Sequence, residues 1–156
     1  MALVGESSFE WVCSYFCLMS IGAVVVPIDK ELPAEEIADI INFGDCEYMF
    51  YSGQIEEKIR EIRDKIPNVK LLICMNKAGS DGAAELSDIV ARGRERFTNG
   101  DNSYHDYEID TERLATIVFT SGTTGKGKGK GVMLSQKNIV SNMTQGCTCL
   151  PLQRKR

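Results

Sequence analysis

The chain has 156 residues, 43% of them hydrophobic, and its 22 acidic and 18 basic side chains give a net charge of −4. This balance excludes a global basic field that would draw the chain to nucleic acid or to an anionic membrane. No run approaches the roughly 18 apolar residues that span a bilayer, and the N-terminal residues lack the pattern of a signal peptide. We therefore expect one soluble folding unit in the cytoplasm, with no nucleic-acid partner and no transmembrane segment.

The start of the chain predicts a strand, a helix and a second strand. Residues 1–5 form a short apolar strand, and Ser7 followed by Glu10 is a capping box that opens a helix. Residues 23–26 are a β-branched run that Pro27 should stop, because proline cannot donate to a sheet ladder. The buried face of the helix is expected to carry side chains at three- and four-residue steps: Phe9, Val12, Cys13 and Phe16.

Strands and helices alternate through the rest of the chain. Pro33 begins the second helix, because proline suits the first turn. Strands are expected at 48–51, 70–74 and, last in the chain, 115–119, and apolar helix faces at Ile37, Ile40 and Ile41, at Ile55, Ile59, Ile62 and Ile66, and at Leu86, Ile89, Val90 and Phe97. This alternation predicts an α/β fold with three layers, α/β/α, around a mainly parallel sheet.

The most informative segment directly follows the last expected strand. Residues 120–131 read TSGTTGKGKGKG and combine glycines, hydroxyl side chains and lysines. Glycine lets consecutive amides point into one concavity, hydroxyls donate to phosphate oxygens, and lysine neutralises their charge. The pattern predicts a phosphate-binding loop. We disfavour a flexible linker, because linkers seldom concentrate threonine and serine at the exit of a buried strand.

Other kinds of site fit the sequence less well. Residues 122–128 nearly satisfy GxxxxGK[ST], but the position that should hold magnesium is Gly129, which argues against an ordinary P-loop NTPase. A nicotinamide-type GxGxxG is present only by letter, within the Gly-Lys repeat. Six cysteines without CxxC spacing and one histidine, His105, predict no metal site, and His105 is expected to be a loop residue without a catalytic role.

Two motifs in order carry a family resemblance. TSGTTGK followed by KGVML resembles the signature phosphate loop of the adenylate-forming superfamily, which includes acyl-CoA synthetases, luciferases and nonribosomal peptide adenylation domains. Upstream, GAVVVPID at 22–29 followed by PAEEI at 33–37 is similar to a structural motif of the same family. The resemblance extends over about residues 1–145, and the surrounding sequence looks closest to long-chain fatty acyl-CoA synthetases.

The resemblance implies an AMP-forming acyl-CoA ligase that uses ATP, Mg²⁺ and coenzyme A. Such an enzyme activates a carboxylic acid, here expected to be a fatty acid, to an acyl-adenylate and then to an acyl-CoA thioester. The residues that it places around the ATP triphosphate are Thr120, Ser121, Gly122, Thr123, Thr124, Gly125, Lys126 and Lys130. It assigns no catalytic residue and no metal ligand in this chain.

The chain also departs from the family pattern. The repeat KGKGKG at 126–131 is two residues longer than usual and lacks the family's proline, which raises the entropy cost of ordering the loop by about 0.5–1 kcal/mol per site. Family elements expected downstream of the loop have no counterpart. We therefore expect a partial N-terminal domain at 1–146, an atypical disordered tail at 147–156, and no activity from the isolated chain.

Two further expectations follow from this partial domain. The alternative function is a non-catalytic nucleotide-binding or inert fragment. In addition, sheet edges that a complete domain would cover predict self-association.

Overall fold

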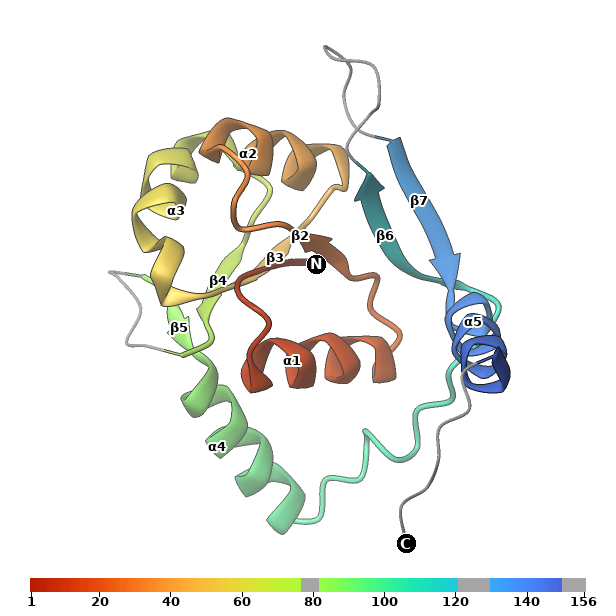
Figure 1. Ribbon diagram of the computed structural model, residues 1–156. Helices are drawn as coiled ribbons and strands as arrows, with labels where there is room; N and C mark the ends of the chain where they lie inside the picture. Colours follow the sequence, from red (N-terminus) through yellow and green to blue (C-terminus); the bar gives the residue numbers. More distant parts are fainter. Residues whose placement is uncertain (77–81, 121–129, 150–156) are drawn as a thin grey trace, which may run out of the picture.

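A five-stranded sheet lies at the centre of the structure, a computed structural model that describes residues 1–76, 82–120 and 130–149 (Figure 1). All neighbouring strands in it are parallel, so their carboxyl ends face the same edge. The strand order is β2-β1-β3-β4-β5, which places β1 between the two strands that follow it in the chain. The strands are β1 (Ala2–Val4), β2 (Val26–Ile28), β3 (Tyr48–Tyr51), β4 (Leu71–Cys74) and β5 (Ala84–Glu85).

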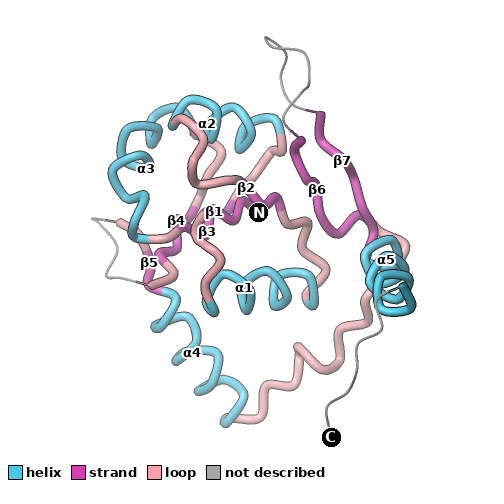
Figure 2. The backbone as a smooth tube through the Cα atoms, in the orientation of Figure 1, coloured by secondary structure: helices cyan, strands magenta, loops and turns pink. Residues whose placement is uncertain are grey.

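Helices cover both faces of this sheet, as Figure 2 shows. Alternate strand residues belong to separate cores: Ala2 and Val4 join the core beneath α2 and α3, whereas Leu3 joins the core above α1 and α4. The three-layer α/β/α prediction is therefore confirmed. The helices are α1 (Phe9–Ser20), α2 (Ala34–Phe43), α3 (Glu56–Ile62) and α4 (Leu86–Thr98), with short 3₁₀ turns at Gly53–Ile55 and Arg63–Lys65 on either side of α3.

The predicted isoleucine faces of α2 and α3 are largely confirmed. Ile37 and Ile41 of α2 are buried against the sheet, and Ile40 packs at the margin of the same core. The four isoleucines expected around α3 are also buried: Ile55, Ile59, Ile62 and Ile66. Both helices are strongly amphipathic, so only one side of each can face the sheet.

The buried face of α1 differs from the prediction. Phe9 is 79% and Phe16 is 54% exposed, whereas Leu18 is 5% exposed and packs on the sheet. Trp11 and Tyr15 stack with ring centroids 5.5 Å apart and lie against the same core. Because α1 carries apolar side chains on two sides, its periodicity fits either face, and only the sheet decides between them.

The N-cap of α1 is also one residue later than expected. Ser8 has extended backbone angles, and its Oγ accepts a hydrogen bond of 3.2 Å from the Trp11 amide. Ser7 therefore does not cap the helix. The two serines are adjacent, and the sequence pattern alone places the cap only to within a residue.

A two-stranded antiparallel sheet and a fifth helix complete the described structure. They are β6 (Leu114–Thr120), β7 (Lys130–Ser135) and α5 (Gln136–Cys149). The strand at 115–119 is thus confirmed but is not the last, and neither β7 nor α5 was predicted. No residue of α5 is buried, so its sequence carries little of the apolar periodicity that reveals a helix. Helix α5 reaches Cys149, three residues past the boundary expected at 146 between the domain and its tail. That domain boundary remains a prediction.

Candidate phosphate-binding site

The expected phosphate loop connects the paired ends of β6 and β7. Thr120 ends β6 and pairs with Lys130 at the start of β7, and both side chains are exposed. These two predicted site residues are therefore neighbours, as one triphosphate site requires. The other predicted site residues lie outside the described ranges: Ser121, Gly122, Thr123, Thr124, Gly125 and Lys126.

Strand β6 is joined to the five-stranded sheet through Val25, the residue directly before β2. The Val25 amide donates to the Ala115 carbonyl at 2.9 Å, and the Ile117 amide donates to the Val25 carbonyl at 3.0 Å. Val25 and Thr116 form a parallel bridge between these bonds. Strand β6 therefore runs in the same direction as the other strands of the sheet.

Pro27 interrupts the pairing between β2 and β6, but it does not terminate β2. It lies inside β2 opposite Leu3 of β1, so the expectation that Pro27 stops the strand is wrong. The Val26 amide points to β1, where it donates to the Met1 carbonyl at 2.8 Å, and the Val25 amide points to β6. Since successive amides alternate in direction, the nitrogen of Pro27 also faces β6, where it has no hydrogen to donate. The ladder with β6 consequently stops after Ile117.

The parallel direction of β6 decides which edge of the sheet Thr120 reaches. The carboxyl ends of β1, β2, β3 and β4 meet at one edge of the sheet, and Thr120 leaves β6 toward that same edge. In open α/β sheets, ligands bind outside the carboxyl ends of the strands. The sequence motif and this general rule therefore indicate the same region.

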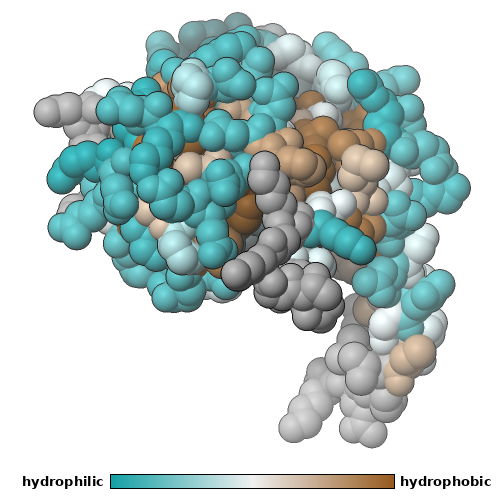
Figure 3. Space-filling model, turned by 90° about the horizontal axis from the view of Figure 1, so that it is seen from above, coloured by the Kyte–Doolittle hydropathy of each residue, from teal (hydrophilic) through white to brown (hydrophobic). Residues whose placement is uncertain are grey.

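Side-chain packing supports the last residues of β6. The Phe119 ring meets Phe43, at the end of α2, edge to face with centroids 5.8 Å apart. Across the hairpin, a Cβ on Gly131 would come within 3.0 Å of Ile117 Cγ2, so glycine lets β7 approach β6 closely. Figure 3 views the molecule from above, the side toward which β6 points in Figure 1, and shows a patch of apolar surface on this otherwise largely hydrophilic face. Phe43 itself is 65% exposed.

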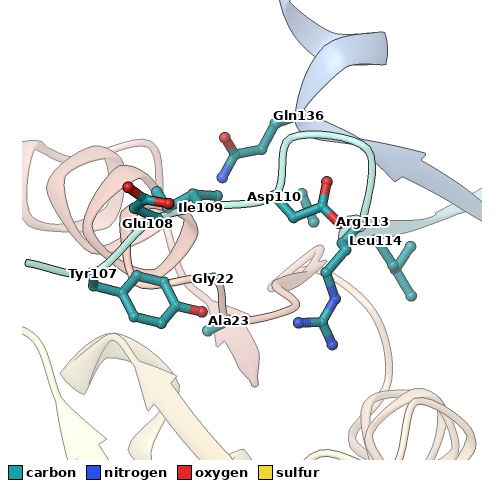
Figure 4. A pocket seen from close by; sticks show the side chains of 10 residues that line it. Gly22, Ala23, Tyr107, Glu108, Ile109, Asp110, Arg113, Leu114 and Gln136 are labelled. Atoms are coloured by element: carbon teal, nitrogen blue, oxygen red, sulfur yellow. The ribbon is translucent and has the colours of Figure 1, made fainter.

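A small hollow lies at the base of the hairpin and not at its tip. Figure 4 shows Tyr107 pointing toward Gly22 and Ala23, with Gln136 on the other side. The hollow measures about 70 Å³ and begins beside Leu114, whereas the loop follows Thr120, so about 20 Å of strand separates the two. The hollow therefore lies at the opposite end of β6 from Thr120. Its walls are Gly22, Ala23, Tyr107, Glu108, Ile109, Asp110, Arg113, Leu114, Ala115 and Gln136.

A polar network, which the sequence did not suggest, closes the carboxyl ends of β1, β3 and β4. The Asn76 side-chain amide donates to Glu6 Oε1 at 2.8 Å and accepts from the Gly53 amide at 3.0 Å. Burial raises the pKa of Glu6, but hydrogen bonds from Ser52, the backbone and Asn76, with the charge of Lys30, lower it below its ordinary value of 4.5. This network fixes three strand ends at the edge where the loop emerges.

The described residues contain no cluster of metal-ligating side chains. Across 1–76, 82–120 and 130–149, no three His, Cys, Asp or Glu side chains lie together as a metal site requires. Lys130 offers a positive charge that attracts phosphate and repels a cation, and the Thr120 hydroxyl can donate a hydrogen bond to a phosphate oxygen. The part of the site that the structure describes is therefore suited to an anion.

The family follows from comparison with known proteins. Residues 1–155 match the family described as AMP-binding enzyme. The chain belongs to this AMP-binding family. The predicted membership in the adenylate-forming superfamily is confirmed, and it accounts for the order of the two sequence motifs.

Two curated relatives of this AMP-binding chain are fatty-acid ligases. The medium-chain-fatty-acid–CoA ligase of Ectopseudomonas oleovorans is 27% identical over 126 residues, which cover 81% of this chain and 22% of that protein. The long-chain-fatty-acid–CoA ligase 5 of Rattus norvegicus is 33% identical over 158 residues, covering 92% of this chain and 22% of that protein. The chain thus spans less than a quarter of the length of either relative.

A solved structure shares the fold of the AMP-binding chain. The long-chain-fatty-acid-CoA ligase of Archaeoglobus fulgidus superposes with a TM-score of 0.73 at 23% identity, covering 96% of this chain and 27% of that one. This likeness confirms the α/β architecture. Separately, no helix within the described ranges has the length and apolar character needed to cross a membrane.

Sequence reasoning missed the residues that attach β6 of this AMP-binding chain to the five-stranded sheet. Val25 and Thr116 join β6 to the sheet, and neither was singled out. A signal was present, because Thr116 is the one polar residue within the apolar run from Leu114 to Phe119. A buried hydroxyl in such a run needs a partner, and Thr116 Oγ1 finds it in the Val25 carbonyl at 2.8 Å.

Proposed function

We propose that this chain supplies the ATP phosphate-binding loop of an AMP-forming ligase that joins a carboxylic acid to coenzyme A. One observation carries the proposal. A loop rich in glycine, hydroxyls and lysine starts at Thr120, at the carboxyl edge of a parallel sheet, and ends at Lys130 directly beside it. This is the edge at which open α/β sheets bind ligands.

The proposed reaction uses the loop to hold the leaving group. Backbone amides and the hydroxyls of Thr123 and Thr124 donate to β- and γ-phosphate oxygens, while Lys126 balances their charge. A carboxylate oxygen of the acid attacks the α-phosphorus, and the bond from that phosphorus to pyrophosphate breaks. The thiol of coenzyme A then attacks the acyl carbon, and AMP leaves. Magnesium, when bound to ATP, supplies further charge neutralisation.

A fatty acid is the proposed substrate class. The support comes from the two relatives, whose names give medium-chain and long-chain fatty acids as their substrates. The chain spans only 22% of each relative, and the described structure does not identify the residues that select the acid. The fatty-acid substrate is therefore a proposal. The cytoplasm remains the proposed location.

The first test measures ATP binding by the chain. In calorimetry with ATP and Mg²⁺, we expect Lys126→Ala and Thr123→Ala each to weaken binding about tenfold, since each removes a group that contacts phosphate. Lys70→Ala is the matched control, because Lys70 is exposed, pairs with Glu47 and lies outside the loop. Absence of ATP binding by the wild-type chain would contradict the proposal.

A second measurement tests the reaction itself. A chimera in which this chain replaces the matching segment of the medium-chain ligase should form acyl-CoA from fatty acids. We expect Lys126→Ala in the chimera to lower kcat by about 10²–10³-fold, the range seen when one charge-stabilising group is removed. A folded chimera that binds ATP but forms no acyl-adenylate would favour the alternative of a non-catalytic nucleotide-binding fragment.

A further inference from the structure

The attachment of β6 to the five-stranded sheet converges on one residue, Val25. The Val25 carbonyl accepts the Ile117 amide at 3.0 Å and also Thr116 Oγ1 at 2.8 Å. Among the described residues, the main-chain hydrogen bonds that tie β6 to the sheet both involve Val25. The hydroxyl of Thr116, a residue that is 1% exposed, adds a third hydrogen bond to these two at Val25.

Beyond this point β6 continues without a main-chain tie to the sheet. The next bond of a parallel ladder would run from residue 27 to the Ile117 carbonyl, and Pro27 has no amide hydrogen to make it. Further along, Phe119 packs at the margin of the core beneath α2 and α3, and its ring meets Phe43 edge to face. The direction of the end of β6, which includes Thr120, therefore depends on the hydrogen bonds earlier in the strand, at Val25 and Thr116.

We propose that Thr116 is a positioning residue for the phosphate-binding loop, acting through its hydroxyl bond to the Val25 carbonyl. The role rests on the proposed function of that loop. Thr116 lies four residues before Thr120, about 13 Å along an extended strand, so it acts on phosphate only through the placement of β6. A small change of angle at the attachment moves the loop by a larger distance at the far end.

The test compares Thr116→Val, which removes the hydroxyl at nearly constant shape, with Thr116→Ser, which keeps it. Hydrogen exchange of the Ile117 amide reports the attachment, and calorimetry with ATP and Mg²⁺ reports the loop. For Thr116→Val we expect Ile117 to exchange about five- to tenfold faster and ATP to bind about five- to tenfold more weakly. Thr116→Ser should restore both values toward wild type.

Two control variants separate positioning from general loss of stability. Ile59→Val removes a buried methyl group from α3, on the opposite face of the sheet from α1, and should lower the melting temperature without changing ATP affinity. Ser14→Ala removes a buried hydroxyl that has no hydrogen-bond partner among the described residues, and it should change neither Ile117 exchange nor ATP affinity.

The outcomes distinguish this inference from the proposed function. Unchanged ATP affinity in Thr116→Val, or equal losses in Thr116→Val and Thr116→Ser, would overturn the positioning role alone. A wild-type chain that binds no ATP would contradict the proposed function of the loop. In that case, faster hydrogen exchange of the Ile117 amide in Thr116→Val than in wild type would still show that the hydroxyl holds β6. Should Thr116→Val fail to fold, a Thr116→Ser variant with weakened ATP binding and fast Ile117 exchange would also overturn the inference.

Discussion

At the scale of single residues, Glu6 couples the fold to pH. Its pKa is lowered in the folded chain, so ionised Glu6 stabilises the fold above its unfolded pKa, and this stability is lost as pH falls through the folded value. We expect Glu6→Gln to reduce the free energy of unfolding at pH 7 and to flatten its decline below about pH 4.5. Urea unfolding at pH 7, 5 and 3.5 measures this, with exposed Glu57→Gln as control. Parallel curves for wild type and Glu6→Gln would contradict the prediction.

Gly22 provides a second test at this scale. Its φ is +72°, and a Cβ there would lie 2.5 Å from the Tyr107 hydroxyl. We expect Gly22→Ala to lower the free energy of unfolding by about 1–3 kcal/mol, through backbone strain and this clash. Gly93→Ala, inside α4 with open space around it, should instead raise it by about 0.5–1 kcal/mol. Denaturant unfolding compares the two, and a similar effect of both would refute the strain argument.

At the scale of elements, the N-cap of α1 and the side of α1 that is buried are determined by different contacts. The Ser8 hydroxyl caps the helix, whereas Ser7, one position earlier, is exposed. Ser8→Ala should therefore destabilise the chain by about 1 kcal/mol, and Ser7→Ala should have little effect. Thermal unfolding followed by circular dichroism measures both. A larger loss for Ser7→Ala would restore the capping box that the sequence suggested.

At the scale of the whole molecule, apolar side chains remain exposed on several elements. The more exposed of them include Phe9, Phe16, Phe43, Met133, Val140 and Met143. Within the described residues, β7 pairs only with β6, so its outer edge is open to another strand.

These features make self-association the expected behaviour of the chain. We expect its mass in sizing chromatography with light scattering to rise with concentration. Met133→Lys should reduce the rise, because a lysine on the edge strand β7 opposes strand pairing. Val90→Lys is the control, since Val90 is also exposed but lies on α4. A constant monomer mass would show the prediction wrong.

Much of the fold could be predicted because its signals are local. The isoleucines of α2 and α3 repeat with helical spacing, and the loop from Thr120 joins residue types that bind phosphate. The elements that were missed, β5, β7 and α5, are short, glycine-containing or without a buried face, so their local signal is weak. Their positions depend on neighbours that are distant in sequence.

The amino-acid sequence by itself determined the alternation of strands and helices, the chemistry of the loop and the family resemblance, because each depends on residues close together in the chain. Only the tertiary structure decided which side of α1 is buried, which neighbour Pro27 fails to bond, and that Val25 and Thr116 hold β6. These outcomes depend on the partner that each surface meets, since an apolar face or an amide group has no preferred partner until the sheet is assembled.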